Sequence, residues 1–229
     1  MRGKLIVIEG TDCSGKETQS NLLRDQLEKE GIPVFKTGFP MYDTPTGKII
    51  GGPYLGKSYL GDGWFMEGAS NVDPKVASLY FAADRRYNVG KINQMLDQGT
   101  NVILDRYVYS NMGHQGGKIL NQQERAAMYQ WLDTLEFEML GLPRPDIALF
   151  LHMPYDKAIL LKQGRQEKGD QHENDVNHLI HAEQAYIELA TNYQWKTIEC
   201  DDDSQIKSIE EINHEVYSYV LAKLKGYQK

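Results

Sequence analysis

Short apolar runs alternate along the chain with segments whose apolar residues recur at helical spacing. Five runs are typical of strands, and they occupy Leu5–Ile8, Val34–Phe39, Asn101–Asp105, Asp146–Leu151 and Lys196–Cys200. Four of the five are largely apolar, as expected of strands that are buried on both faces of a sheet. The pattern therefore predicts an α/β fold with a parallel sheet of about five strands and helices on both faces.

Three further segments have a recognisable character. One helical segment has an apolar stripe, formed by Met128, Leu132, Leu135 and Met139, that predicts one inward face. Residues 51–68 are rich in glycine and aromatic residues and are expected to form an irregular excursion. Residues 164–175 are polar and charged with no apolar face, and we expect them to form a mobile loop.

Length and composition are those of an ordinary globular protein. The 229 residues suffice for one sizeable core, and 41% of them are hydrophobic and 25% charged. We therefore expect a single domain that spans residues 1–229. The formal net charge of −7 argues against a nucleic-acid partner, which needs a dominant cationic face.

The sequence gives no sign of a membrane or of secretion. No stretch is apolar enough over a sufficient length to span a bilayer, and the first residues lack a signal-peptide pattern. Cys13 and Cys200 are the only cysteines and form neither a CxxC pair nor a disulfide framework. We therefore expect a cytoplasmic protein without a membrane partner.

A glycine-rich motif follows the first strand-like run. Residues Gly10–Lys16 spell GTDCSGK and match the GxxxxGK pattern of phosphate-binding loops. Their backbone N–H groups and the following helix N-terminus would hold phosphates, and Lys16 would reach the β- and γ-phosphates. The motif predicts a P-loop NTPase-type sheet that binds ATP. The predicted nucleotide-binding residues are Gly10, Thr11, Asp12, Cys13, Ser14, Gly15, Lys16, Glu17 and Thr18.

The end of this motif departs from the usual pattern. The position after Lys16 ordinarily holds a Ser or Thr whose hydroxyl binds Mg²⁺, but here it is Glu17, followed by Thr18. Three alternatives stay open: Thr18 supplies the hydroxyl, water and other carboxylates hold the metal, or the chain binds a nucleotide without catalysis. We take Thr18 and Asp105 as the candidate metal ligands.

Two charged residues close the third strand-like run. Asp105 and Arg106 follow it directly, and ligands of open parallel sheets bind at the carboxyl ends of strands. Both side chains would then face the same crevice as the phosphate loop. Phosphoryl transfer needs cations around the moving group and a carboxylate that orients the metal or the nucleophile. Lys16, Asp105 and Arg106 are therefore candidate catalytic residues.

In their order and spacing these motifs resemble the thymidylate kinase family, most closely its bacterial type with cations in the phosphate loop and the lid. The similarity extends over nearly the whole chain, through IEGTDCSGKETQ, TGFP, LYFAADRRY, ILDRYVYSNMGHQ, LPRPDIALFLHM and DQHEND. The resemblance implies transfer of the γ-phosphoryl group of ATP to thymidylate (dTMP), with Mg²⁺. It also implies a homodimer whose mobile lid comprises residues 164–175.

The resemblance implies roles for single residues as well. Asp12 matches a carboxylate that accepts from the sugar 3′-hydroxyl, and Phe81 matches an aromatic ring that stacks on thymine. Arg85 matches an arginine that reaches thymine O4, and Arg106 one beside the acceptor phosphate. His114 matches an aromatic residue that crowds the 2′ position. The implied substrate-binding residues are Asp12, Pro40, Tyr42, Phe81, Arg85, Arg106, Ser110, Asn111, His114 and Gln115, with Ser110, Asn111 and Gln115 reading the base.

Two departures concern the charge around the phosphates. An arginine that binds the acceptor phosphate is common two residues after the Phe-Pro pair, but this position is Tyr42. Two alternatives stay open: Lys48 or Arg86 compensates, or the affinity for the acceptor is lower. The phosphate loop also lacks the arginine that some members carry. We therefore expect the lid to supply a catalytic cation, chiefly Arg165 with Lys168 second.

Other functions stay open from the residues alone. A deoxynucleoside kinase would need a carboxylate base after the first strand, where Glu9 lies. Another pyrimidine monophosphate kinase would need a changed base-reading strip. A non-catalytic ATP-binding sensor is the remaining alternative, and only Glu17 supports it.

Overall fold

The protein is seen here as a computed structural model that describes residues 1–163, 175–202 and 205–226. Five parallel strands form one sheet in the order β2-β3-β1-β4-β5. The strands are β1 (Leu5–Gly10), β2 (Val34–Gly38), β3 (Asn101–Asp105), β4 (Ile147–His152) and β5 (Lys196–Glu199). The predicted parallel α/β sheet is confirmed, although β2, at one edge, is half-buried along its whole length and not buried on both faces.

Helices fill the connections between the strands. They are α1 (Lys16–Lys29), α2 (Pro45–Ile49), α3 (Pro74–Asp97), α4 (Val108–Gly116), α5 (Gln122–Asp133), α6 (Tyr155–Gln163), α7 (Val176–Asn192) and α8 (Ile209–Gly226). Two π-helical segments, Ile50–Tyr54 and Thr134–Met139, continue α2 and α5, and a single 3₁₀ turn, Ala69–Asn71, precedes α3.

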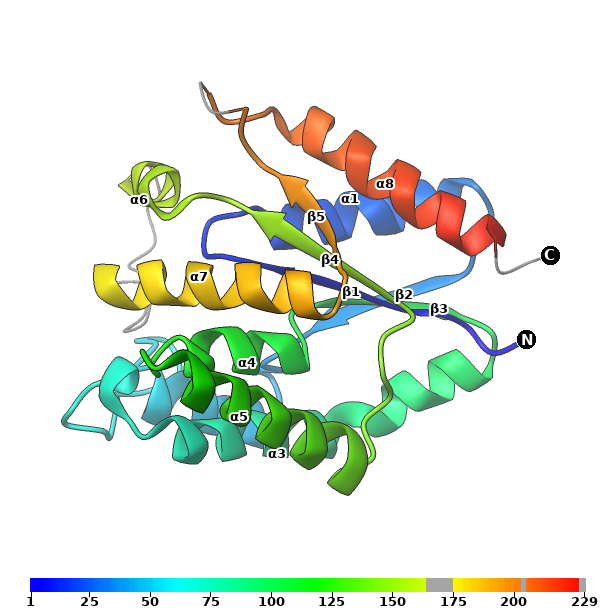
Figure 1. Ribbon diagram of the computed structural model, residues 1–229. Coiled ribbons are helices and arrows are strands. Elements are labelled where there is room, and N and C mark those ends of the chain that lie inside the picture. The colour runs from blue at the N-terminus through cyan, green and yellow to red at the C-terminus, as the bar shows by residue number, and fades with distance from the viewer. Residues whose placement is uncertain (164–174, 203–204, 227–229) are drawn as a thin grey trace.

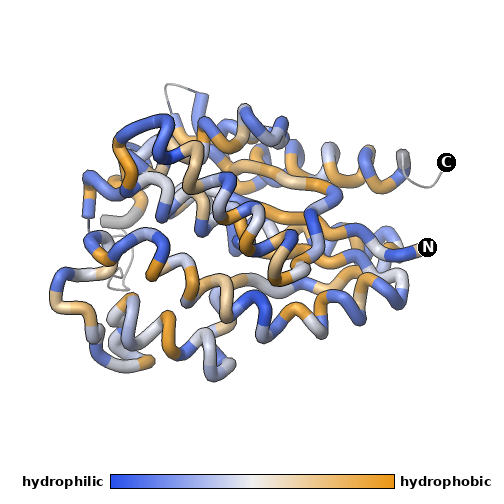
Figure 2. Tube along the Cα trace, turned by 60° about the horizontal axis from the view of Figure 1, so that its bottom comes forward, coloured by the Kyte–Doolittle hydropathy of each residue, from blue (hydrophilic) through white to orange (hydrophobic). Residues whose placement is uncertain are grey.

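The central strand β1 separates two helical layers (Figure 1). Leu5 and Val7 pack into a hydrophobic cluster with residues of α3, α4, α5 and α7, whereas Ile6 and Ile8 pack with residues of α1 and α8. The alternation follows from the two-residue period of a strand. Hydrophobic residues accordingly concentrate in the interior, along the strands and the inner sides of the helices (Figure 2). The same period directs Glu9 toward α4 and α7.

The inward face of α5 differs from the prediction. The first two positions of the predicted stripe are buried, but Leu135 is half-buried and Met139 is 74% exposed. The turn that contains both is π-helical, and it directs Glu136 and Phe137 into the interior instead. A π-turn has more residues than an α-turn, so it breaks the 3.6-residue period from which the stripe was predicted.

Two further observations bear on the sequence-based expectations. Residues 164–174 lie outside the described residues, so the predicted lid, with Arg165 and Lys168, stays a prediction. Within the described ranges, no helix combines the length and the apolar character needed to cross a membrane.

His152, at the end of β4, connects this strand to α7 and to β5 through its side chain. Its Nε2 lies 2.8 Å from Glu183 Oε1 on α7, and its Nδ1 lies 2.6 Å from Glu199 Oε2 on β5. The hydrogen bond to Glu183 raises the pKa of His152 to about 8, against the opposing effect of burial and with the help of Glu199. Unfolded histidine has a pKa near 6.5, so the charged ring stabilises the fold fully below about pH 6.5. This contribution is lost as the pH rises through about 8.

We therefore expect His152→Gln to lower the free energy of unfolding by about 1 kcal/mol more at about pH 6 than at about pH 9, a value reduced for solvent screening. Urea denaturation at both pH values measures the difference. His214→Gln, at an exposed position of α8, is the matched control. Equal losses for His152→Gln at both pH values would contradict a charged His152 in the folded protein.

Candidate active site

The predicted phosphate loop connects β1 to α1 at the carboxyl edge of the sheet. Gly10 is required by close packing, because a Cβ there would lie 2.5 Å from Ser14 Oγ and 2.7 Å from Leu151 O. Cys13 has a φ of 60°, in the left-handed region that non-glycine residues rarely adopt. Such strain is typical of functional loops that the surrounding structure holds in place.

Lys16, the first residue of α1, lies folded into the loop. Its Nζ donates to Thr11 O at 2.6 Å and to Ser14 Oγ at 3.4 Å. Burial lowers the pKa of Lys16 to about 8, the charge of Arg106 acts in the same direction, and nearby carboxylates oppose the shift. The ammonium group thus lies among the backbone groups that would hold phosphates. Glu17 and Thr18, the next two residues of the helix, are both exposed.

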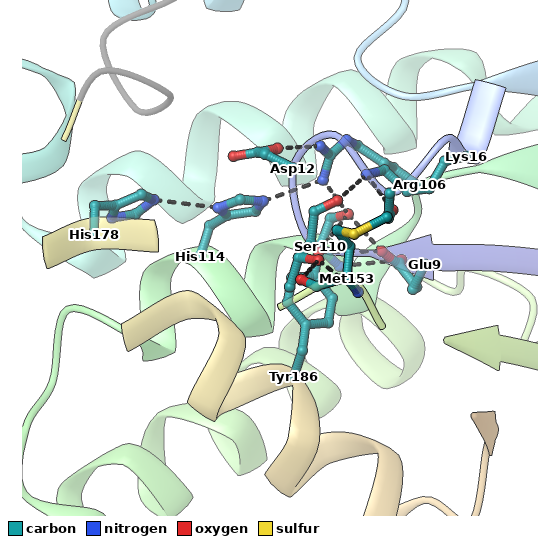
Figure 3. A network of polar contacts seen from close by, with 11 residues as sticks. Glu9, Asp12, Lys16, Arg106, Ser110, His114, Met153, His178 and Tyr186 are labelled. Atoms are coloured by element: carbon teal, nitrogen blue, oxygen red, sulfur yellow. Dashed lines mark hydrogen bonds and ion pairs between the residues drawn. The ribbon is translucent and has the colours of Figure 1, made fainter. Parts of the chain in front are cut away.

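Glu9 forms the centre of a buried hydrogen-bond network (Figure 3). Its Oε1 accepts from the backbone N–H groups of Tyr107 at 2.8 Å and Ser110 at 3.1 Å. Its Oε2 accepts from Ser110 Oγ at 2.6 Å and from the Tyr186 hydroxyl at 3.3 Å. Burial raises the pKa of Glu9, although the hydrogen bond from Ser110 and the charge of Arg106 act in the opposite direction. The carboxylate therefore supplies the cap of α4, since the N-cap residue Tyr107 makes no side-chain cap.

This position of Glu9 removes one of the alternatives. A general base must reach the substrate hydroxyl, but both oxygens of Glu9 are engaged by four donors, and Glu9 does not line the pocket that opens beside Asp12 and Arg106. Glu9 is a structural acceptor, so the deoxynucleoside kinase alternative loses its candidate base.

Arg106 links the phosphate loop to α4. Its φ is 65°, its Nη2 donates to Asp12 Oδ1 at 2.7 Å, and its Nη1 lies 3.1 Å from His114 Nε2. Burial disfavours the charge of Asp12, but Arg106 and the neighbouring cationic groups outweigh it and hold the pKa of Asp12 well below its usual range. The guanidinium is thus fixed between the loop and the helix.

Hydrogen bonds continue from Arg106 to α7 (Figure 3). Arginine can only donate, so His114 Nε2 accepts and its proton lies on Nδ1, which is 3.2 Å from His178 Nε2. The two rings stack with centroids 5.4 Å apart. His178 lies in the first turn of α7, so the phosphate loop is connected through two side chains to that helix.

A pocket of about 160 Å³ opens beside Asp12 and Arg106. Every residue that the resemblance implied for substrate binding lines it, namely Asp12, Pro40, Tyr42, Phe81, Arg85, Arg106, Ser110, Asn111, His114 and Gln115. The sequence did not indicate the other lining residues, which are Phe39, Leu55, Lys57 and Tyr107.

Arg85 lies in the pocket wall and is 2% exposed. Its Nη2 donates to Glu136 Oε1 at 2.6 Å, its Nε donates to Glu136 Oε2, and Asn111 Nδ2 donates to the same Oε1 at 3.1 Å. Sequence reasoning missed Glu136, because the π-turn is what directs it inward. The ion pair fixes the orientation of Arg85 in the wall.

Two buried acceptors in the pocket wall, Asn111 Oδ1 and Gln115 Oε1, have no hydrogen-bond partner among the described residues. The amide of Asn111 is oriented by its Nδ2, which donates to Ser78 O and to Glu136. A buried acceptor without a donor costs about 1–3 kcal/mol. The wall therefore matches a ligand that presents N–H groups.

Lys48 and Arg86 lie outside the pocket wall. Both are exposed, and neither lines the pocket. Arg86 follows Arg85 on α3 and so points to a different side of the helix. The expectation that one of them compensates for Tyr42 stays a prediction that the pocket lining does not support.

A strained glycine-rich loop with a buried lysine, an arginine at the end of the neighbouring strand and a pocket beside them together define a P-loop phosphotransferase. The family model for thymidylate kinase matches residues 8–213. The chain belongs to the thymidylate kinase family, and the members of that family are enzymes that phosphorylate dTMP with ATP to give dTDP and ADP.

Relatives and a solved structure agree with this membership. The chain is 28% identical to the thymidylate kinase of Dictyostelium discoideum, over 99% of this chain and 89% of that protein. It is 31% identical to the probable thymidylate kinase of Pyrococcus abyssi, over 99% of this chain and 100% of that protein. The structure of thymidylate kinase from Candida albicans is similar with a TM-score of 0.72 and 25% identity, over 96% and 92% of the two chains. The narrower resemblance to the bacterial type stays a prediction.

The Arg85–Glu136 pair makes a testable prediction. Removing one partner of a buried ion pair leaves the other charge uncompensated, so Glu136→Gln should lower the free energy of unfolding by about 3 kcal/mol. Asp97→Asn is the control: it removes a carboxylate of α3 whose pair with Arg2 is exposed on both sides, and should cost about 1 kcal/mol or less. Urea denaturation measures both. Equal losses in the two variants would show that the pocket pair is no more than a surface ion pair.

Proposed function

We propose that the pocket binds dTMP and that the loop Gly10–Thr18 binds ATP, so that their phosphates meet at Arg106. The single observation that carries this proposal is the pocket itself, whose wall gathers all the implied substrate residues beside the Asp12–Arg106 pair. An oxygen of the acceptor phosphate attacks the γ-phosphorus, and the bond from that phosphorus to the β,γ-bridging oxygen breaks. ADP leaves, and dTDP forms.

Base recognition follows from the side walls of the pocket. Asn111 Oδ1 or Gln115 Oε1 can accept from the single N3–H of thymine, which would satisfy one of the buried acceptors that lack a donor among the described residues. Phe81 offers a ring for stacking, and Tyr54 packs edge-on against it at 5.6 Å. Arg85, oriented by Glu136, would reach thymine O4, and His114 would crowd the 2′ position.

The transferring group would be surrounded by cations. We assign Lys16 to the β- and γ-phosphates and Arg106 to the acceptor phosphate, and we assign Arg165, with Lys168 second, to the lid side of the site. Asp12 would accept from the sugar 3′-hydroxyl in addition to holding Arg106.

Mg²⁺ enters as part of the MgATP substrate. Among the described residues, no group of three or more His, Cys, Asp or Glu side chains could hold a metal ion, which fits an ion bound mainly by phosphate oxygens and water. When bound, the ion would neutralise negative charge on the phosphates. We propose Asp105, half-buried at the end of β3, and Thr18, in the first turn of α1, as the protein groups nearest to it.

We further propose that the protein is a cytoplasmic homodimer. Val76, Leu79, Tyr80 and Tyr87 recur at helical spacing on the exposed side of α3, and a second copy would cover this apolar side. Neither Cys13 nor Cys200 is in a disulfide, as expected in a reducing compartment. Sedimentation of the purified chain measures its oligomeric state.

A coupled assay of ADP release over a panel of acceptors tests the proposed function. With MgATP, we expect the highest kcat/KM for dTMP and lower values for UMP and CMP. We expect no turnover of thymidine, because thymidine lacks the phosphate that Arg106 would bind. Faster turnover of thymidine than of dTMP would refute the assignment of the pocket.

The same assay tests base recognition. Gln115→Leu keeps the size of the side chain but removes the acceptor, so it should raise the KM for dTMP about tenfold and leave the KM for ATP unchanged. Gln123→Leu, exposed on α5, is the control. An unchanged KM for dTMP in Gln115→Leu would exclude Gln115 from base recognition.

A further inference from the structure

The described charges of the pocket do not match a substrate phosphate well. Arg85 is paired with Glu136, and Arg106 is paired with Asp12, so each arginine already neutralises a carboxylate. A phosphate monoester brings a charge of about −1.5 to −2 at neutral pH. Tyr42, which also lines the pocket, adds no charge. A further cationic donor in the pocket wall would add charge-assisted hydrogen bonds to the phosphate oxygens.

The strand register relates Tyr42 to Arg106. Gly38 of β2 and Asp105 of β3 are directly paired, so the two strands end level at the same edge of the sheet. The chain leaves β2 toward Tyr42 and leaves β3 toward Arg106 from that edge. The backbone N–H of Phe39 donates to Asp105 O at 3.0 Å, so the segments that follow β2 and β3 begin side by side. Tyr42 thus follows β2 at the edge of the sheet where Arg106 follows β3, and both residues line the pocket.

Lys57 is the cation of the pocket wall that lies at Tyr42. It comes from the excursion 51–68, and its Nζ is 5.4 Å from the centroid of the Tyr42 ring. The ring itself packs directly on Gly51, because a Cβ there would lie 2.9 Å from Tyr42 Cδ1. An ammonium over an aromatic face is an attractive arrangement, so the ring helps to place the charge.

The backbone of Lys57 is held firmly. Its N–H donates to Gly51 O at 2.8 Å, and its carbonyl oxygen accepts from Leu60 N at 2.8 Å and Gly61 N at 3.1 Å. The excursion also has a small core of its own, and Lys118 of the α4–α5 connection donates to Ala69 O at 2.8 Å. The side chain of Lys57 thus starts from a fixed point in an otherwise irregular segment.

We propose that Lys57 binds the phosphate of the acceptor nucleoside monophosphate and that the ring of Tyr42 positions it. This inference rests on the proposed function, since it names the group that recognises the acceptor phosphate. A lysine is a compact charge with three donors, so it can contact phosphate oxygens from the rim of the pocket while Arg106 contacts them from the sheet.

Titration calorimetry with dTMP and with thymidine tests the inference. Lys57→Gln should weaken dTMP binding roughly 10- to 100-fold, as expected for the loss of hydrogen bonds from a charged donor, and leave thymidine binding within about threefold. Lys48→Gln is the matched control, because Lys48 is exposed on neighbouring α2 and does not line the pocket. It should change neither affinity.

The outcomes separate the inference from the proposed function. If the unmodified protein binds dTMP no more tightly than thymidine, the proposed function fails. If it prefers dTMP and Lys57→Gln retains that preference in full, only the assignment of Lys57 fails. A Lys57→Gln variant that loses dTMP and thymidine equally would also overturn it, because the residue would then act by shaping the pocket and not by binding phosphate.

Discussion

The carboxylate of Glu9 is the interaction on which the geometry of the site depends. It lies at the end of the central strand, is fully buried, and accepts from two backbone N–H groups and two hydroxyl groups. A buried carboxylate is costly unless its lone pairs are satisfied, and a satisfied one resists displacement. Since the donors come from the start of α4 and from α7, Glu9 fixes both helices relative to β1 and to the phosphate loop that follows it.

The position of Arg106 is a consequence of this anchor. Arg106 lies between the end of β3 and Tyr107, and the backbone N–H of Tyr107 donates to Glu9. The left-handed backbone of Arg106 is tolerated because the residues before and after it are fixed in the strand and in the cap of α4. Its guanidinium then meets Asp12 of the phosphate loop, and His114 connects it to α7. The phosphate-binding motif and the pocket are thereby joined by partly buried polar contacts, and such preorganisation suits phosphoryl transfer.

Much of the fold and of the pocket could be predicted from the sequence. Strand period and apolar runs suffice for a parallel sheet, because burial on both faces leaves a strong local signal. The motif Gly10–Lys16 gives the phosphate loop, because its spacing is set by backbone geometry. The pocket residues came from the resemblance and not from periodicity, since Phe81 and Arg85 alone match an ordinary helix.

The rest depended on contacts between distant segments, which local patterns do not encode. Glu136 faces Arg85 only because a π-turn interrupts α5, and Lys57 reaches the pocket only through the folding of an irregular excursion. The position of Glu9 after the first apolar run makes it a candidate base in the sequence. Its place two residues after Val7 and four after Leu5 puts it on the same face of the strand, which indicates that it points toward α4 and α7.

The most direct measurement of the central claim is the kcat of Glu9→Leu with saturating MgATP and dTMP. Leucine keeps much of the volume of the side chain but removes both acceptor oxygens, so the backbone N–H groups of Tyr107 and Ser110 lose their partner and the start of α4 is released. A displacement of about 1 Å in a catalytic group can cost roughly a hundredfold in rate. We predict a fall in kcat of that size with the KM for ATP within about threefold of the unmodified protein. A kcat within about threefold of the unmodified protein would contradict the claim that this buried carboxylate holds the site together.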